Sequence, residues 1–291
     1  MDILDRIRLA SYAKVNLFLN ITGVRDDGYH ELDMVNAKIS LHDDIICSLT
    51  NAPEIELVCS ESTVPADETN TAYKAAERFI LQTKVTPGAR VHIRKRVPHG
   101  AGLGGGSSNA AATLIALNQL AKYPLSMPEL SKIAEGIGAD VPFFLEQGCC
   151  YVAGVGERVM GLVAAKRIDR MGVVICSPAE GVATHGAYGL WDKSGKIEQK
   201  SPKPLMQALV NGDWDTIPKL LYNAFEPVIF DAYPVVAKAY KDFKKISPTK
   251  PLLSGSGSNL FSIHPTLDEA EPIALAMQKA GYDAHAYELI L

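Results

Sequence analysis

The part of the sequence with the clearest chemical meaning is a glycine-rich stretch between a predicted strand and a predicted helix. A loop in this context brings backbone N–H groups and a helix N-terminus to one point, which is what an anion such as a nucleotide phosphate requires. Glycines allow the backbone to approach closely, and two serine hydroxyls add donors or a ligand for Mg²⁺. The stretch therefore predicts a phosphate-binding loop. Its residues are Pro98, His99, Gly100, Ala101, Gly102, Leu103, Gly104, Gly105, Gly106, Ser107 and Ser108.

Other kinds of nucleotide-binding loop do not fit this stretch. No Gly-Lys-Ser/Thr closes it, as a Walker A loop requires. Gly100, Gly102 and Gly105 satisfy G-x-G-x-x-G, but no second strand ending in an acidic residue follows about 20 residues later, as a dinucleotide-binding fold requires. The protein-kinase motifs V-A-I-K, H-R-D and D-F-G are absent. A flexible loop without a ligand is the remaining alternative, although its glycines would then cost backbone entropy without compensation.

Asp140 and Lys14 are the candidates for a chemical step. Asp140 precedes the apolar run 141–144, so its carboxylate can be directed into a cleft and accept the proton of an attacking hydroxyl. A turn or helix-cap role is the alternative. Lys14 shares a strand face with Asn16, because residues two apart in a strand point the same way. Lys14 can stabilise an ionised Asp140, orient the hydroxyl or meet developing charge, and an exposed strand lysine is the alternative.

Three smaller groups are candidates for binding. Tyr29 and His30 lie in a glycine-containing turn, where an aromatic face and an imidazole suit a cytosine ring. Asn70 precedes a predicted helix and is a candidate for contact with adenine, or simply a helix cap, for which Asn is preferred. Gly255 and Ser256 belong to a tight turn of small residues that we expect beside the phosphate-binding loop, with a plain turn as the alternative.

The elements that position these residues follow from periodicity and capping signals. Residues 13–21 alternate as a strand whose one face meets the core and whose other face is mostly polar. Helices are expected from a cap at Thr69 or Asn70 through Lys84, and over 109–121 from a cap at Ser107 or Ser108. This α+β order has no repeated βα unit, which disfavours a barrel. Further strands are expected at 34–41, 45–49, 55–59, 90–94, 172–176, 259–263 and 283–289, a turn or domain edge at 154–156, and helices at 129–137, 204–211, 215–222, 231–245 and 267–280.

Composition restricts the class of protein. The chain has 291 residues, of which 47% are hydrophobic, enough for two domains with sizeable cores. A net charge of -4 and no long basic run disfavour nucleic acid as a partner. No apolar stretch approaches the roughly 20 residues of a membrane span, and the N-terminus lacks signal-peptide features, so we expect a cytoplasmic protein without membrane contact. The five cysteines contain no C-x-x-C pair and are expected to be buried reduced thiols.

Three motifs together resemble the GHMP kinases, which include galactokinase, homoserine kinase, mevalonate kinase and phosphomevalonate kinase. They are residues 13–17 (Ala-Lys-Val-Asn-Leu), the loop 98–108 and residues 253–258 (Leu-Ser-Gly-Ser-Gly-Ser), and the resemblance covers nearly the whole chain. His99, Ala101 and Ser254 depart mildly from the family pattern. The segments 25–32, 138–144 and 154–157 are most similar to the branch that phosphorylates an alcohol of a cytidine diphosphate compound in isoprenoid biosynthesis.

This resemblance implies a two-domain fold with the active site in the inter-domain cleft, an ATP-binding domain over 1–160 and a second domain over 161–291. It implies ATP and Mg²⁺ as cofactors, with Ser108 as a metal ligand, Asp140 and Lys14 as catalytic residues and Asn16 as a substrate ligand. It also adds Thr184 and Tyr188 to Tyr29 and His30 in the cytidine site. A kinase for homoserine or phosphomevalonate, and a nucleotide-binding regulator without catalysis, are the rival hypotheses. The sequence does not indicate an oligomeric state.

Overall fold

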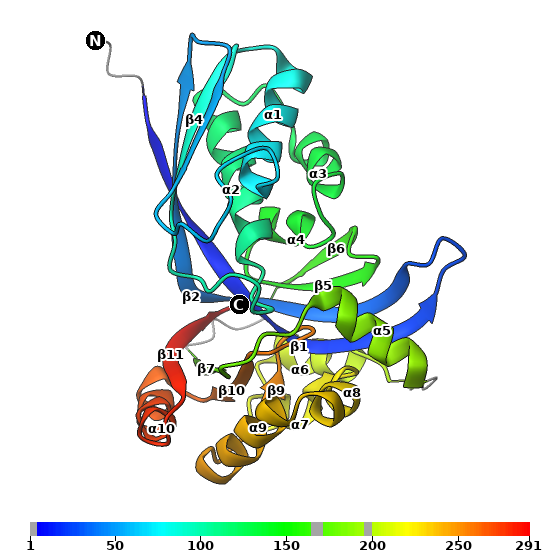
Figure 1. Ribbon diagram of the computed structural model, residues 1–291. Coiled ribbons are helices and arrows are strands. Elements are labelled where there is room, and N and C mark those ends of the chain that lie inside the picture. Colours follow the sequence, from blue (N-terminus) through cyan, green and yellow to red (C-terminus); the bar gives the residue numbers. More distant parts are fainter. Residues whose placement is uncertain (1–4, 164–170, 195–199) are drawn as a thin grey trace. The chain divides into compact units, whose positions relative to one another are not determined.

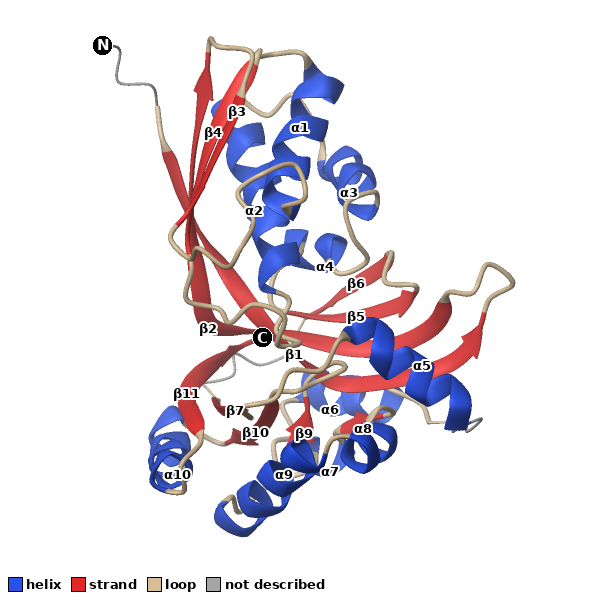
Figure 2. Ribbon diagram, in the orientation of Figure 1, coloured by secondary structure: helices blue, strands red, loops and turns tan. Residues whose placement is uncertain are grey.

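The computed structural model describes residues 5–163, 171–194 and 200–291 (Figures 1 and 2). Its contacts form two compact units. The first unit consists of Met1–Ala13, Leu41–His99 and Gly104–Glu146, and the second of Lys14–Ser40, Gly100–Leu103 and Gln147–Leu291. Both units combine strands with helices, as the α+β class requires. The expected domain boundary after residue 160 stays a prediction.

In the first unit, helices cover strands. Strand β3 (Ile55–Cys59) pairs in parallel with β4 (Gly88–Arg94), and β4 pairs antiparallel with the second half of β2 (His30–Thr50). Helices α1 (Thr71–Thr83), α2 (Gly105–Leu120), α3 (Met127–Glu135) and α4 (Val141–Leu145) pack against one another, and α1 also contacts β3 and β4 (Figure 1). The phosphate-binding loop thus leaves a sheet strand, β4, and ends at a buried helix, α2.

Local signals in the sequence explain two of these helices. Asn70 caps α1 by accepting a hydrogen bond from the N–H of Ala72, and α1 ends at Lys84, which adopts the left-handed conformation. A capping box joins Ser126 to Glu129 at the start of α3. Each of these signals supplies partners for backbone groups that a helix end would otherwise leave unsatisfied.

In the second unit, most strand pairs are antiparallel. Strands β5 (Cys149–Gly154) and β6 (Arg158–Leu162) form a hairpin, in which β5 pairs with the first half of β2. Strand β11 (Asp283–Ile290) pairs with β2 and with β7 (Gly172–Ser177), followed by β10 (Leu260–His264) and β9 (Leu252–Leu253). Helix α10 (Leu267–Lys279) packs on β7 so closely that a Cβ at Gly172 would collide with the carbonyl oxygen of Thr266. The unit therefore has a sheet backed by α10.

The remaining elements lie between β7 and β9 in the sequence. They are α5 (Thr184–Ser194), α6 (Lys203–Asn211), α7 (Ile217–Leu220), β8 (Tyr222–Asn223), α8 (Glu226–Ala232) and α9 (Pro234–Ile246). The helix expected over 215–222 is confirmed only over 217–220, because Tyr222 belongs to β8, which pairs in parallel with β1 (Ile7–Val24). The helix expected over 231–245 is interrupted at Tyr233, since a residue before proline avoids the helical region and Pro234 opens α9.

Several other expectations are confirmed. The strands expected at 34–41 and 45–49 are one continuous strand, β2, and the glycines at 154–156 form the turn between β5 and β6. The cysteines are free thiols, four of them buried, and burial raises the pKa of Cys47 to about 12. No helix within the described ranges has both the length and the apolar character needed to cross a bilayer.

Candidate active site

The phosphate-binding loop has a backbone that only glycine adopts readily. Gly100, Gly102 and Gly104 have φ values of 68°, 75° and 70°. Helix α2 begins directly after Gly104, so the expected helix start near Asn109 with a serine cap is wrong. Glycines at the start of a helix lower its propensity, which is why the sequence pattern placed the start too late. The last residues of the loop are therefore the first turn of α2.

The N-terminus of α2 has the features of an anion site. Its cap residue, Gly104, makes no side-chain hydrogen bond, and the first turn contains no acidic side chain. The N–H groups of the first turn of a helix have no intrahelical partner, and the helix dipole places partial positive charge there. Gly106 is exposed and Ser107 half-buried at this turn. A phosphate group suits this end of the helix, and Cβ-free glycines keep the approach open.

Ser108 is the buried hydroxyl of the same turn, with 3% exposure. The Oγ of Ser11 lies 2.8 Å from the Oγ of Ser108 and 2.7 Å from the Oδ1 of Asn109. Ser11 has a single hydroxyl hydrogen, so it donates to one of these two oxygens at a time. The Oγ of Ser108 accepts at most this one hydrogen bond from Ser11, so a lone pair is left for a further partner. The Mg²⁺ role of Ser108 stays a prediction that this arrangement fits.

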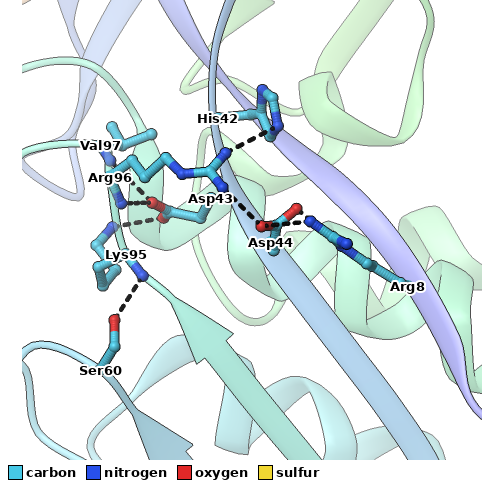
Figure 3. A network of polar contacts seen from close by, with 8 residues as sticks. All are labelled: Arg8, His42, Asp43, Asp44, Ser60, Lys95, Arg96 and Val97. Carbon is cyan, nitrogen blue, oxygen red and sulfur yellow. Dashed lines mark hydrogen bonds and ion pairs between the residues drawn. The ribbon is translucent and has the colours of Figure 1, made fainter.

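A buried carboxylate, Asp43, fixes the chain where it enters the loop (Figure 3). Its two oxygens accept hydrogen bonds from the N–H of Arg96 at 2.6 Å, the N–H of Val97 at 2.8 Å and the Nζ of Lys95 at 2.5 Å. The side chain of Asp43 is fully buried and that of Lys95 is 8% exposed. A Cβ at Gly105 would lie 3.2 Å from the Nζ of Lys95, so this ammonium lies beside the first residue of α2.

The neighbouring Asp44 forms a separate ion-pair group. It receives hydrogen bonds from Arg8 at 2.8 and 3.1 Å and from Arg96 at 3.1 Å (Figure 3). Burial by itself raises the pKa of Asp44, but the hydrogen bond from Arg8 and the charges of both arginines outweigh it. The pKa of Asp44 therefore lies below its ordinary value.

Asn70 has the capping role that was the alternative at the sequence level. Its Oδ1 accepts from the N–H of Ala72 at 2.9 Å and its Nδ2 donates to the carbonyl of Pro65 at 2.7 Å. The next residue, Thr71, donates to the carbonyl of Gly106 at 2.7 Å and so joins α1 to the first turn of α2. The adenine contact expected of Asn70 stays a prediction.

Asp140 lies immediately before α4, where it is half-buried. Asp140 is the N-cap residue of α4, although its side chain makes no capping hydrogen bond, so the turn or cap alternative stays open beside the catalytic prediction. The short helix after it buries Pro142, Phe143 and Phe144, whose packing fixes the direction in which the chain leaves Asp140.

In the second unit, Lys14 and Asn16 form a buried pair on β1. The Nζ of Lys14 donates to the Oδ1 of Asn16 at 2.6 Å, and the two residues are 4% and 1% exposed. A Cβ at Gly255 would lie 3.3 Å from the Oδ1 of Asn16 and 3.6 Å from the Nζ of Lys14. The alternative of an exposed strand lysine is therefore wrong. Lys14 and Asn16 share a strand face, as the sequence analysis expected, and Gly255 lies next to both.

The turn at 254–259 lies against loop residues that belong to the same unit. Ser254 donates to the carbonyl of Gly102 at 3.2 Å, and Asn259 donates to the carbonyl of Ala101 at 2.8 Å. The N–H of Lys14 donates to the carbonyl of Leu103 at 3.0 Å. A Cβ at Gly102 would lie 2.5 Å from the carbonyl oxygen of Ser254. The turn is thus beside the loop, whose exposed residues are Pro98, His99, Gly100 and Gly106.

Of the side chains expected to bind cytidine, His30 and Tyr188 lie together, whereas Tyr29 and Thr184 have other surroundings. His30 is 11% exposed, and its ring lies 4.4 Å from Tyr188 and 5.6 Å from Trp191, measured between centroids. Its Nε2 is 2.7 Å from the Oδ1 of Asp192. Tyr29, by contrast, is 65% exposed. Thr184 is paired with Ser256, at 3.1 Å between their hydroxyl oxygens.

Two stretches of the chain match a known family. The description "GHMP kinases N terminal domain" fits residues 70–148, and "GHMP kinases C terminal" fits residues 205–283. The chain is also 38% identical over 279 residues to the 4-diphosphocytidyl-2-C-methyl-D-erythritol kinase of Desulfitobacterium hafniense (strain Y51), with 96% of this chain and 94% of that protein covered. The chain belongs to the GHMP kinase family.

Other relatives of this GHMP kinase agree. A protein with the same name from Nitratidesulfovibrio vulgaris (strain DP4) is 34% identical over 290 residues, covering 99% of both chains. A crystal structure of 4-(cytidine 5'-diphospho)-2C-methyl-D-erythritol kinase matches with a TM-score of 0.82 and 30% identity over 98% of this chain and 100% of that chain. Homoserine kinase from Cytophaga hutchinsonii ATCC 33406 shares the fold, with a TM-score of 0.75 at 18% identity over 100% of this chain and 96% of that one. The expected GHMP kinase fold is confirmed.

Sequence reasoning on this GHMP kinase missed several residues around the predicted ones. Asp43 has a visible signal, because two consecutive acids interrupt an otherwise apolar strand pattern. Asp192 and Trp191 lie on α5, a helix that the sequence analysis did not predict. Asn36, which contacts Asn16, has no local signal at all. Lys14 and Asp140 belong to different units, so their expected pairing stays a prediction.

Proposed function

We propose that this GHMP kinase transfers the γ-phosphoryl group of ATP to the 2-hydroxyl of 4-diphosphocytidyl-2-C-methyl-D-erythritol, a step of the non-mevalonate isoprenoid pathway. The observation that carries the proposal is the near full-length similarity to relatives that have this name, at 34–38% identity. The buried Lys14–Asn16 pair and the glycine-rich start of α2 supply the residue types that such a reaction needs.

ATP would bind with its phosphates at the N-terminus of α2. The N–H groups of the first turn would donate to phosphate oxygens, and the ammonium of Lys95 would add positive charge beside Gly105. Asp43 would hold Lys95 and the start of the loop in place before ATP arrives, so little reorganisation accompanies binding. Mg²⁺ would enter with the phosphates of ATP, with Ser108 as a protein ligand, and would neutralise part of their charge.

The cytidine end of the acceptor would bind at the His30 cluster. His30 and Tyr188 have ring faces on which a planar base could stack, and Trp191 lies nearly perpendicular to the ring of His30. The imidazole of His30 adds a hydrogen-bonding atom. Tyr29 would reach the base only by moving its exposed ring, and Thr184 would act through its contact with Ser256.

The chemical step in this proposal needs two side chains. Asp140 would accept the proton of the 2-hydroxyl as its oxygen attacks the γ-phosphorus. The bond from the γ-phosphorus to the β,γ-bridging oxygen breaks, and ADP carries away the negative charge. Lys14 would stabilise charge on the transferred phosphoryl oxygens, while Asn16 holds its ammonium in one position.

A substrate panel tests the proposal. The purified protein is incubated with ATP, Mg²⁺ and the cytidine substrate, homoserine or phosphomevalonate, and ADP release is measured together with the ³¹P spectrum of the product. We expect turnover with the cytidine compound to exceed the others by about 100-fold or more, and to yield a phosphomonoester at the 2-position. ATP consumption that does not depend on the cytidine compound would refute the proposal, and binding without any turnover would favour the regulator hypothesis.

A further inference from the structure

Three polar side chains form a buried row across strands β1 and β2. The Nζ of Lys14 donates to the Oδ1 of Asn16 at 2.6 Å, and the Nδ2 of Asn16 donates to the Oδ1 of Asn36 at 2.7 Å. The exposed fractions of the three residues are 4%, 1% and 0%. The row runs from the proposed catalytic lysine into the sheet of the second unit, where Asn36 lies opposite Cys150 of β5.

Lysine determines the direction of every hydrogen bond in this row. An ammonium group has only donors, so Asn16 must turn its Oδ1 toward Lys14. The Nδ2 of Asn16 then faces the other way and needs an acceptor. Asn36 supplies that acceptor through its own Oδ1. If the partner of Asn16 were a donor, Asn16 would rotate and present an N–H group to the ammonium, which repels it.

Packing alone does not account for an asparagine at position 36. Its Nδ2 is buried and has no hydrogen-bond partner among the described residues, which is unfavourable for a polar group. A leucine, which has the same branched shape with two methyl groups in place of the amide atoms, would lie between such apolar neighbours as Met34 and Val152 without an unpaired donor. The amide is therefore retained at a cost, and its one described side-chain contact is with Asn16.

The geometry points to Asn36 as a positioning residue of the kinase reaction, an inference that rests on the proposed function of Lys14. By accepting from Asn16, Asn36 holds the Oδ1 of Asn16 toward the ammonium and so fixes the rotamer of a long and flexible side chain. Gly255 leaves the space beside this ammonium and the Oδ1 of Asn16 free of a Cβ. Asn36 itself touches neither substrate and acts through Asn16 and Lys14.

The test is a double-mutant cycle between Asn36→Leu and Lys14→Met. Asn36→Leu removes the acceptor, and we expect kcat to fall about 10-fold to 100-fold, with the KM values for ATP and the cytidine substrate changed less than about twofold. We expect Lys14→Met to be slow, and adding Asn36→Leu to it should cost nothing further in kcat, because Asn36 acts through Lys14. Asn36→Asp keeps the acceptor and should stay within about threefold of the wild-type kcat. If Asn36→Leu does not fold, Asn36→Val takes its place, since a β-branched residue suits a buried strand.

Asn118→Leu is the control for loss of a buried amide. Asn118 is 4% exposed and makes two hydrogen bonds to Leu125 at the far end of α2 from the loop. It should lower the melting temperature and leave kcat unchanged. If Asn36→Leu keeps full kcat while Lys14→Met is slow, the inference on Asn36 is wrong and the proposed function stands. If Asn36→Leu and Lys14→Met lower kcat independently, the positioning role is also wrong. If Lys14→Met keeps full kcat, both the proposed role of Lys14 and the inference on Asn36 fail.

Discussion

The start of α2 and the Lys14 row offer two ways of building a functional region. At α2, the groups that would face a phosphate are backbone N–H groups, and glycines set their direction through positive φ at Gly102 and Gly104. In the Lys14 row, the backbone is an ordinary strand and the functional atoms are side-chain nitrogen and oxygen. The first region is sensitive to an added Cβ, whereas the second is sensitive to a changed functional group.

The two regions also differ in the residues that hold them in place. The loop before α2 is held by a charged group, because the fully buried Asp43 pairs with Lys95 and with two backbone N–H groups. Lys14 is held by the neutral amides of Asn16 and Asn36. These two amides carry no charge, whereas the carboxylate of Asp43 does. We therefore expect changes near α2 to act on ATP binding and changes in the chemical residues to act on turnover.

The largest effect is expected for Asp140→Asn. Asparagine keeps the shape of Asp140 but cannot take a proton, so kcat should fall by about 10²–10⁴-fold while KM for both substrates changes little. Steady-state kinetics with the folded variant measures this. Asp213→Asn is the matched control, since Asp213 is an exposed turn residue that accepts from the N–H of Thr216. A variant at position 140 that kept more than about a third of the wild-type kcat would assign Asp140 to a structural role.

The next effect is expected for Gly104→Val, which tests the main-chain region. Gly104 has a φ of 70°, where a β-branched residue is strained, and a valine there would displace the N–H groups that a phosphate needs. Loss of one or two charge-assisted hydrogen bonds, at about 1.5–3 kcal/mol each, corresponds to ATP affinity about 100-fold weaker or more. Calorimetric titration with ATP measures it. Gly161→Val is the control, because Gly161 is exposed in β6 with nothing within 4 Å of its Cβ position. Unchanged ATP affinity in folded Gly104→Val would rule out the phosphate-binding role of the loop.

Much of this arrangement follows from local sequence signals. Strand β3 has the bounds that alternation predicts, 55–59, and Asn70 caps α1 as its residue type favours. The glycine-rich loop was found because its composition has few explanations other than close approach of the backbone to a ligand. Lys14 and Asn16 were paired by the two-residue period of a strand, which the structure confirms.

The parts that the sequence did not predict depend on contacts between distant segments. Asn36 is 20 residues from Asn16, and nothing near it in the sequence indicates that the two amides meet. The start of α2 is misplaced by the sequence analysis because glycine has low helix propensity, which the burial of Gly105 and Ser108 in that turn overrides. The sequence pattern continues the expected helix into Tyr222, the first residue of β8. In the structure, the side chain of Asn223 donates to the carbonyls of Leu253 and Gly255, and these distant contacts hold β8 extended.

A smaller effect is expected for His30→Ala, which separates the acceptor site from the ATP site. Loss of the ring removes a stacking face beside Tyr188 and a hydrogen-bonding atom, about 1–3 kcal/mol or 5-fold to 150-fold in affinity for the cytidine substrate. ATP affinity should stay within about twofold. His285→Ala is a matched control, because His285 forms a similar pair with Asp283, at 3.0 Å, on the surface of β11. Equal weakening of both ligands would contradict the assignment of the cytidine site.

The smallest effect is expected from Asp44, and it concerns stability rather than catalysis. Because Arg8 and Arg96 hold the pKa of Asp44 below its ordinary value of 3.8, the folded state binds its proton less readily than the unfolded state. The contribution of Asp44 to stability is therefore complete above the unfolded pKa, and it is lost as pH falls through that value and then through the folded pKa. Since both arginines are more than half exposed, each pair is worth at most about 1 kcal/mol.

Asp44→Asn should lower the free energy of unfolding at pH 7 by about this amount, and the difference from wild type should shrink between about pH 5 and pH 3. Urea unfolding across that range measures it, with Asp231→Asn, which removes an exposed carboxylate on α8, as the control. The kinetic constants of Asp44→Asn should match wild type at pH 7, because at the loop entrance Asp44 bonds to the exposed side chain of Arg96, while Asp43 holds the N–H groups of Arg96 and Val97. If ATP affinity fell together with stability, both acids would belong to the support of the phosphate-binding loop.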